Sequence, residues 1–186
     1  MRTSLAAWLI GSWVLSPVAL LHAQKFTNPD TLAPDFPTPQ VVVDRMLVLA
    51  SVKPTDVVYD LGCGDGRILI SAVQTYHCHA VGVELSRDIY DRTCQRIKAM
   101  GLSDQISMIH GNALQTDFSA ADVVTLYLMT STNERLRPQM ERYLKPGTRV
   151  VSHDYEVHGW KPVKEEVVAV DGRPHKLYLY VMKPKH

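Results

Sequence analysis

The stretch from Val57 to Ile70 reads V-V-Y-D-L-G-C-G-D-G-R-I-L-I, and the fold of this chain is predicted from it. A mostly apolar segment leads into a loop with three glycines at alternate positions, and a second apolar segment follows at once. This pattern is typical of a parallel strand that passes through a glycine-rich loop into a helix, a unit that binds nucleoside-type ligands at the carboxyl end of the strand.

The spacing of the glycines distinguishes between two nucleoside cofactors. Gly62, Gly64 and Gly66 form G-x-G-x-G, and Arg67 stands where the dinucleotide fingerprint G-x-G-x-x-G has its last glycine. Asp60 stands just before the turn. This combination points away from NAD and toward S-adenosyl-L-methionine.

The composition is that of one globular domain with no sign of a nucleic-acid partner. The chain has 186 residues and a net charge of +1, from 20 basic and 19 acidic residues, so it lacks the basic footprint that duplex nucleic acid requires. The three cysteines are scattered and predict no disulfide framework. His77-Cys78-His79 has no second ligand pair at zinc-like spacing, so it is interpreted as a turn, and no metal site is predicted.

The first 23 residues differ from the rest of the chain. Arg2 precedes a largely apolar run over residues 5–21, and Ala23 provides a small residue, which together are typical of a secretory signal peptide. Leu21 interrupts the small-x-small cleavage pattern, and the run is also long enough for a membrane anchor. Both alternatives predict an exported, periplasmic or membrane-anchored protein with membrane association through this segment, although S-adenosyl-L-methionine is made in the cytoplasm.

Three parts of the chain follow from these patterns. Residues 1–23 are predicted to be a signal peptide or membrane anchor, residues 24–39 a proline-rich connector, and residues 40–186 the cofactor-binding domain. Thr38-Pro39 predicts the start of the first helix, with a capping hydroxyl followed by proline.

The fold class predicted for the domain is α/β, a Rossmann-like open and mostly parallel sheet with a C-terminal antiparallel hairpin. The hairpin turn is expected at Asp171-Gly172-Arg173-Pro174. Helices are expected between the strands, and the last long one at residues 133–144. The strands are expected at residues 57–61, 80–84, 106–110, 123–129, 149–152, 166–170 and 177–182.

Polar residues at strand ends are the candidates for ligand contacts, because ligands of such a sheet lie beyond the carboxyl ends of its strands. Glu84 closes the second strand, 22 positions after Gly62, where a carboxylate can accept the hydroxyls of a ribose; the alternative is a solvated carboxylate. Asn112 follows the third strand and is a candidate for the adenine edge. Asp65 is a candidate for the amino group of the ligand.

The chain resembles a known superfamily in V-Y-D-L-G-C-G-D-G-R, G-V-E-L-S and G-N-A, which are similar to the motif series of class I S-adenosylmethionine-dependent methyltransferases. The likeness covers roughly residues 37–182. Within the superfamily, P-T-P and R-V-V-S followed by W-K-P are similar to the lysine N-methyltransferases that act on ATP synthase subunit c and on the adenine nucleotide translocase. The resemblance implies S-adenosyl-L-methionine as cofactor and a protein lysine as acceptor.

The resemblance also implies roles for the matching positions. The glycine loop and Asp60 would line the methionine and ribose portion of the cofactor, with Thr38 over the methionine end. Glu84 would bind the ribose, and Asn112 with Ala113 would bound the adenine, although many relatives carry Asp in place of Asn112. The cofactor-binding residues predicted in this way are Thr38, Asp60, Gly62, Gly64, Asp65, Gly66, Glu84, Asn112 and Ala113.

The methyl acceptor is expected on the side of the fourth and fifth strands, since the cofactor occupies the ends of the first three. A sulfonium methyl is already reactive, so the protein mainly has to align an unprotonated nucleophile. Candidates on this side are Tyr127, otherwise a packing residue, and the predicted catalytic pair His153 and Asp154, otherwise ordinary loop residues.

The leading hypothesis from these observations is an S-adenosyl-L-methionine-dependent methyltransferase with a protein lysine as acceptor. A small-molecule methyltransferase and a non-catalytic S-adenosyl-L-methionine-binding protein are the alternatives. An NAD-dependent oxidoreductase is disfavoured by the glycine spacing and by the terminal hairpin.

Overall fold

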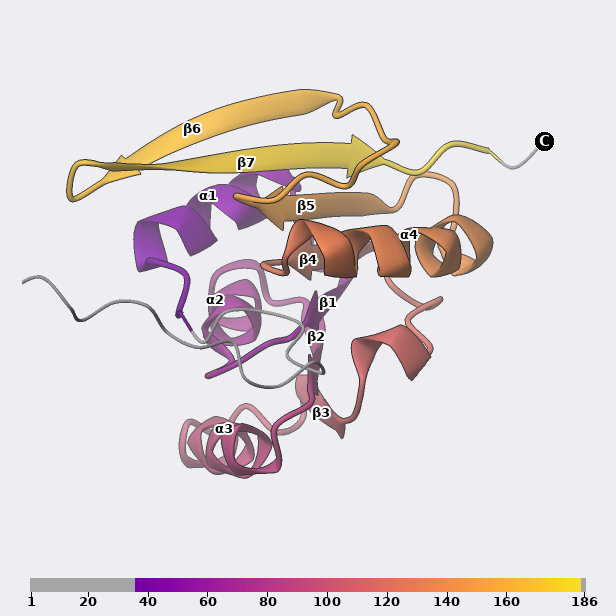
Figure 1. Ribbon diagram of the computed structural model, residues 1–186. Helices are drawn as coiled ribbons and strands as arrows, with labels where there is room; N and C mark the ends of the chain where they lie inside the picture. Colours follow the sequence, from indigo (N-terminus) through magenta and orange to yellow (C-terminus); the bar gives the residue numbers. More distant parts are fainter. Residues whose placement is uncertain (1–35, 185–186) are drawn as a thin grey trace, which may run out of the picture. The chain divides into compact units, whose positions relative to one another are not determined.

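The computed structural model describes residues 36–184, which form a seven-stranded sheet with helices on both faces (Figure 1). The strands are β1 Val57–Leu61, β2 His79–Glu84, β3 Ile106–His110, β4 Val123–Leu126, β5 Arg149–His153, β6 Lys164–Val170 and β7 Arg173–Val181. The helices are α1 Gln40–Leu49, α2 Arg67–Tyr76, α3 Arg87–Ala99 and α4 Thr130–Tyr143, with a short 3₁₀ helix, η1, at Ala113–Gln115.

The strand order is β3-β2-β1-β4-β5-β7-β6. Neighbours among β1 to β5 are parallel, whereas β7 runs antiparallel to both β5 and β6. The predicted fold class, an open and mostly parallel sheet that ends in an antiparallel hairpin, is therefore confirmed. The turn of the hairpin is shorter than predicted: Asp171 and Gly172 adopt positive φ angles, as a two-residue turn requires, and Pro174 already pairs with Ala169.

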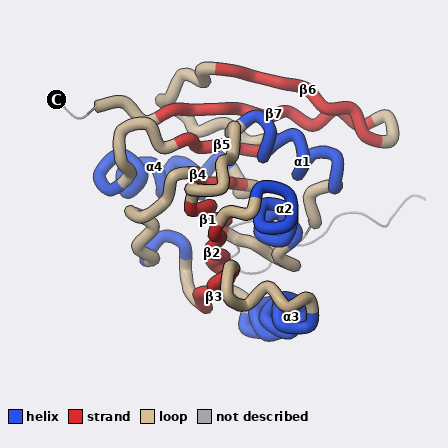
Figure 2. The backbone as a smooth tube through the Cα atoms, turned by 180° about the vertical axis from the view of Figure 1, so that it is seen from behind, coloured by secondary structure: helices blue, strands red, loops and turns tan. Residues whose placement is uncertain are grey.

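Two apolar clusters hold the layers together, one on each face of the sheet. Helices α1, α2 and α3 cover one face, and α4 and η1 cover the other, which is easiest to follow from behind (Figure 2). Gly82 of β2 lets α2 approach closely, since a Cβ there would lie 2.5 Å from Leu69 Cδ1. This tight packing holds the start of α2, and with it the glycine loop, against the sheet.

Several element boundaries differ from the sequence prediction: β7 begins at Arg173 instead of residue 177, α4 spans Thr130–Tyr143 instead of residues 133–144, and the bounds of β2, β5 and β6 shift by one or two residues. Two further differences bear on the site. Strand β4 ends at Leu126 instead of residue 129, because the apolar run continues outside the ladder: Leu128 is buried under the glycine loop. Helix α1 begins at Gln40 with Pro39 as its N-cap, and no side chain caps it. The Thr38 hydroxyl points instead to His153, 3.3 Å from its Nδ1, so the predicted capping role is wrong.

The predicted localisation, exported or membrane-anchored, is contradicted. A spanning helix needs about 20 apolar residues. Among residues 36–184 no helix is long and apolar enough to cross a membrane, and the longest, α4, has 14 residues. Residues 1–23, on which the signal-peptide and membrane predictions rested, lie outside the described residues, and the division into parts at residues 23 and 39 stays a prediction.

Candidate active site

A cavity of about 380 Å³ lies at the carboxyl end of β1, within the range of about 300–1,000 Å³ that is usual for ligand pockets. Four parts of the chain line it: the segment before α1, the loop from β1 to α2 with the start of α2, one face of α3, and the residue after β4. The lining residues are Phe36, Pro37, Thr38, Asp60, Gly62, Cys63, Gly64, Asp65, Arg67, Ile68, Ile89, Arg92, Thr93, Arg96 and Tyr127.

The three glycines of the loop have different roles. A Cβ on Gly62 would lie 3.0 Å from Leu128 Cδ2, and a Cβ on Gly66 would lie 2.8 Å from Thr93 Cγ2, so these two glycines permit close packing within the protein. A Cβ on Gly64 would meet no atom within 4 Å, and Gly64 lines the cavity. The space in front of Gly64 is therefore available to a ligand, whereas Gly66 shapes the loop from behind.

Asp60 is the buried carboxylate of the cavity. It lies opposite Thr125 in the parallel ladder, and the Thr125 hydroxyl donates to Asp60 Oδ1 over 2.7 Å. Burial raises the pKa of Asp60 to about 7, against the effect of the Thr125 hydroxyl, and the charges of Glu84 and Asp65 raise it further. A cationic group bound beside Asp60 would favour its ionised form and lower this pKa.

Glu84 lies behind the loop and does not line the cavity. Its Oε2 accepts from the Gly64 amide at 3.0 Å, and its Oε1 accepts from the Ser86 amide at 2.8 Å. Each carboxylate oxygen has a further lone pair, so these bonds leave acceptor capacity for ribose hydroxyls. Glu84 is only 8% exposed, so the alternative interpretation of a solvated carboxylate is wrong.

The two predicted adenine residues lie at η1, also outside the cavity lining. Asn112 Oδ1 accepts from the Leu114 amide at 2.9 Å and so caps η1. Ala113 is buried in the apolar cluster on the α4 face. Contacts of these residues with adenine stay a prediction.

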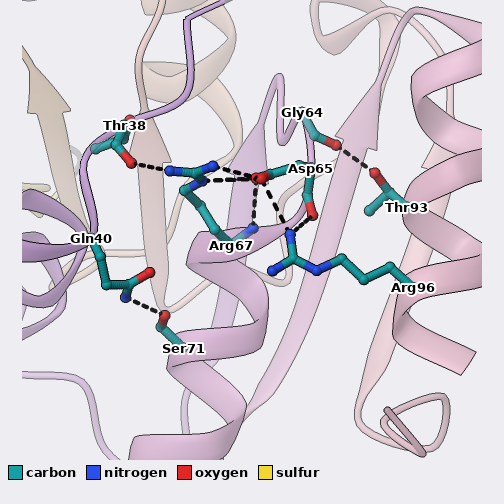
Figure 3. A network of polar contacts seen from close by, with 8 residues as sticks. All are labelled: Thr38, Gln40, Gly64, Asp65, Arg67, Ser71, Thr93 and Arg96. Atoms are coloured by element: carbon teal, nitrogen blue, oxygen red, sulfur yellow. Dashed lines mark hydrogen bonds and ion pairs between the residues drawn. The ribbon is translucent and has the colours of Figure 1, made fainter. Parts of the chain in front are cut away.

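A polar network ties the loop to the segment before α1 (Figure 3). Arg67 forms several hydrogen bonds with the Asp65 carboxylate, the shortest at 2.7 Å, and its Nη1 donates to the Thr38 carbonyl at 2.8 Å. Arg96 of α3 also lies 3.2 Å from Asp65. Burial pushes the pKa of Asp65 up, but the hydrogen bonds and charges of Arg67 and Arg96 outweigh it, so the pKa lies below its usual range. Asp65 therefore lines the cavity as an ionised group.

Helix α3 contributes a wall that the sequence analysis missed. The Thr93 hydroxyl donates to the Gly64 carbonyl at 2.7 Å, which attaches the loop to the helix. Thr93 is buried and lies four residues after Ile89 and four before Ile97. That spacing places the three residues on one face of the helix and is the signal by which Thr93 was identifiable.

On the acceptor side, Tyr127 lines the cavity and His153 stands directly behind it. The two rings stack with their centroids 4.0 Å apart, and His153 is fully buried. Burial lowers the pKa of His153 to about 4, although the charge of Asp154 opposes this. His153 contacts two lining residues, Tyr127 and Thr38, without lining the cavity itself.

Asp154 lies one step further from the cavity. Its Oδ1 accepts from the Lys176 amide at 2.9 Å, and its Oδ2 is 3.4 Å from both His153 Nε2 and His175 Nδ1. The structure therefore brings the two predicted catalytic residues together, and adds His175 from β7, which no sequence pattern had indicated.

Comparison with known proteins agrees with this geometry. The family model of the ANTKMT methyltransferase domain matches residues 60–164. The chain belongs to this family. This methyltransferase is 47% identical to a protein-lysine N-methyltransferase of Saccharolobus islandicus over 151 residues, which cover 80% of the chain and 93% of that protein. It is 28% identical to the adenine nucleotide translocase lysine N-methyltransferase of Mus musculus, covering 65% of the chain and 52% of that protein.

A solved structure with the same fold is bound to the product form of the cofactor. It is titled an RNA methyltransferase of Salinibacter ruber in complex with S-adenosyl-L-homocysteine. The TM-score is 0.75 and the identity 42%, over 81% of this methyltransferase and 96% of that chain.

The cofactor of this methyltransferase is S-adenosyl-L-methionine, which supplies an electrophilic methyl group on a sulfonium. The residues of the cavity fit it. Asp60 provides a carboxylate for a ligand that carries an ammonium and a sulfonium, and Asp65 adds a second that already pairs with Arg67 and Arg96. Gly64 leaves the space in front of the loop open. Residue types and available space therefore agree with the family assignment.

Proposed function

We propose that this methyltransferase transfers the methyl group to the side-chain amine of a protein lysine. The observation that carries the proposal is Tyr127, which lines the cavity on the side of β4 and β5 with its ring supported by His153. An aromatic wall excludes water, and this desolvation lowers the pKa of an entering ammonium toward the unprotonated amine that the transfer requires. The name of the relative at 47% identity supports the same acceptor.

The residues of the chain then have the following proposed roles. Asp60 and Asp65 face the cationic portion of the cofactor. Gly64 allows the backbone to approach it, and Gly62, packed on Leu128, lines the cavity beside Gly64. Thr38 closes the methionine end. Further residues act around the cavity: Gly66 shapes the loop, Glu84 accepts the ribose hydroxyls, and Asn112 with Ala113 bounds the adenine. Alignment of the amine with the methyl group supplies most of the rate enhancement.

His153 and Asp154 are proposed as positioning residues. Neither lines the cavity, so they would act through the residues that do: His153 stacks on Tyr127, and Asp154 lies against His153. The ring of Tyr127 would then be held at a fixed distance from the methyl group.

The acceptor class is tested with labelled cofactor and the full chain. The enzyme is incubated with methyl-labelled S-adenosyl-L-methionine and, separately, with heat-denatured total protein, total RNA and a small-molecule extract. Label recovered as methyllysine after acid hydrolysis of the protein supports the proposal. Label found in nucleosides, or in the small-molecule fraction alone, overturns it. RNA is included because of the Salinibacter ruber structure, although the net charge of +1 does not favour it.

A further inference from the structure

Three side chains near the end of β5 direct ligand atoms toward one point. His153 Nε2 lies 2.9 Å from His175 Nδ1, and Asp154 Oδ2 lies 3.4 Å from each of these nitrogens. Both imidazoles are buried, and the carboxylate is largely so. Within residues 36–184 this is the group of His, Cys, Asp and Glu side chains whose geometry allows it to hold a metal ion.

Two of the three distances match those of a metal centre, and the third, between the two imidazole nitrogens, is that of a hydrogen bond. With Zn–N and Zn–O bonds of about 2.0–2.2 Å, neighbouring ligand atoms of a tetrahedral zinc site lie about 3.3–3.6 Å apart. The two distances that involve Asp154 fall in this range, and the two nitrogens would separate by only a few tenths of an ångström. Two imidazoles and one carboxylate are a ligand set that zinc and related transition ions accept, with a fourth position for water.

We propose that His153, Asp154 and His175 form a binding site for one divalent transition ion, with zinc as the best fit. Surrounding contacts already orient the ligands, as metal sites require. The Thr38 hydroxyl lies 3.3 Å from His153 Nδ1, which directs Nε2 to the site. The Lys176 amide binds Asp154 Oδ1, which leaves Oδ2 for the ion.

The backbone of Asp154 also supports the proposed metal site. Asp154 has a φ of 60°, a left-handed conformation that is uncommon for residues other than glycine. Its amide donates to the Lys176 carbonyl at 2.7 Å, so both the backbone and the side chain of Asp154 are held by β7. These two contacts hold the Asp154 carboxylate beside the two imidazoles.

A simpler account is a hydrogen-bonded cluster completed by Arg173. The Arg173 Nη2 lies 3.6 Å from Asp154 Oδ2, but the Arg173 side chain is 66% exposed, and such surface pairs are weak. The two accounts differ in their prediction. In a hydrogen-bonded cluster the guanidinium is a member, whereas at a metal site it is a competitor for the carboxylate.

A bound ion would connect β5 to β7 and fix a ring that contacts the cavity. The site joins the end of β5 to β7, and His153 contacts both Thr38 and Tyr127 of the cavity. The ion would therefore act as a structural clamp behind the proposed acceptor side. It would touch neither cofactor nor acceptor.

The test uses Co²⁺ as a visible probe for the site. Full-length protein without a histidine tag is stripped with EDTA, dialysed and titrated with Co²⁺, and Zn²⁺ is then added in competition. We expect one equivalent of Co²⁺ with the absorption bands of a tetrahedral site, their loss on addition of Zn²⁺, and a rise of several degrees in Tm with either ion.

Three variants distinguish this site from adventitious binding. His175→Ala should weaken uptake by more than about 100-fold, since loss of an outer-sphere partner alone costs 10- to 100-fold. The control His158→Ala removes an exposed histidine paired with Glu134 and should bind as the wild type does. Arg173→Ala alters only an exposed side chain, so the fold should persist, and it should strengthen uptake. The proposal is overturned if the wild type takes up no Co²⁺, if His175→Ala binds as tightly as His158→Ala, or if Arg173→Ala binds no more tightly than the wild type.

Discussion

The carboxylate of Glu84 at the end of β2 accepts a hydrogen bond from the Gly64 amide, with 3.0 Å between Oε2 and the nitrogen. Its other oxygen accepts from Ser86, the N-cap residue of α3. One side chain thus holds both the loop that lines the cavity and the start of the helix that forms its wall. A change at Glu84 should affect the loop as well as any bond to the ribose.

Replacement of Glu84 by alanine should weaken binding of S-adenosyl-L-methionine by roughly 1.5–3 kcal/mol, because a charged acceptor is lost. It should also lower Tm, because the Gly64 and Ser86 amides lose their acceptor. Glu84→Gln is the matched control: it keeps one acceptor oxygen and should be less affected in both properties. Calorimetry and thermal melts measure the two effects, and unchanged affinity in Glu84→Ala would contradict the ribose role.

Gly64 and Gly101 form a matched pair for testing the loop. Both have positive φ angles, 53° and 69°, and a Cβ on either meets no atom within 4 Å. Alanine should therefore cost about 1 kcal/mol of stability at both positions. Only Gly64→Ala should weaken cofactor binding, by tenfold or more, because its methyl group enters the cavity. Equal affinities of the two variants, measured by calorimetry, would mean that the ligand does not approach Gly64.

Asp60 should make both stability and cofactor affinity depend on pH. Its pKa in the folded protein is about 7 and in the unfolded chain about 4. The stability that it contributes is therefore fully present below about pH 4 and is lost as the pH rises through about 7. Affinity for the cationic cofactor should rise over the upper part of this range, as Asp60 ionises.

Asp60→Asn keeps an acceptor for Thr125 and removes the titration. Its free energy of unfolding should fall less between pH 4 and pH 7 than that of the wild type, and its affinity should change less between pH 6 and pH 8. Denaturant melts and calorimetry at several pH values measure these quantities. Identical pH profiles for the two proteins would show that Asp60 does not titrate in this range.

Arg67 should control the segment that precedes α1, because it bridges Asp65 and the Thr38 carbonyl. Arg67→Ala is expected to reduce cofactor affinity roughly tenfold, about 1.4 kcal/mol. This is the size expected for the loss of hydrogen bonds between a charged guanidinium and the Asp65 carboxylate. Arg87→Ala is the control, since Arg87 pairs with Asp91 on the exposed surface of α3 and should leave affinity unchanged. Equal binding by the two variants would assign Arg67 no part in the cavity.

Substitutions at His153 or Asp154 should lower the turnover rate more than they lower cofactor affinity. Alanine at either position should lower kcat about tenfold or more and should change the Kd for S-adenosyl-L-methionine far less, because Tyr127 lies on the acceptor side and only the Thr38 contact of His153 reaches the cofactor side. Single-turnover assays and calorimetry separate the two constants, and thermal melts establish that each variant is folded. Full turnover in both variants would refute the positioning role.

The sequence by itself determined the elements and the cofactor class. Apolar runs such as residues 57–61 and the spacing of Gly62, Gly64 and Gly66 reflect local backbone geometry, which repeats every two residues in a strand and every 3.6 in a helix. Such patterns can be recognised in a sequence wherever residues that are close in sequence also lie close in space. These patterns predicted a β4 that is longer than the observed strand, because the apolar run continues to Leu128, which is buried by the glycine loop after the ladder has ended.

Tertiary structure alone decided which side chains meet around the cavity. Thr93 reaches Gly64 from 29 positions away, and His175 reaches His153 from 22. Neither contact follows from local periodicity, because it depends on which strand lies next to which and in what register. The antiparallel insertion of β7 beside β5 brings His175 to His153. A pairing shifted by one residue would turn that imidazole to the other face of the sheet.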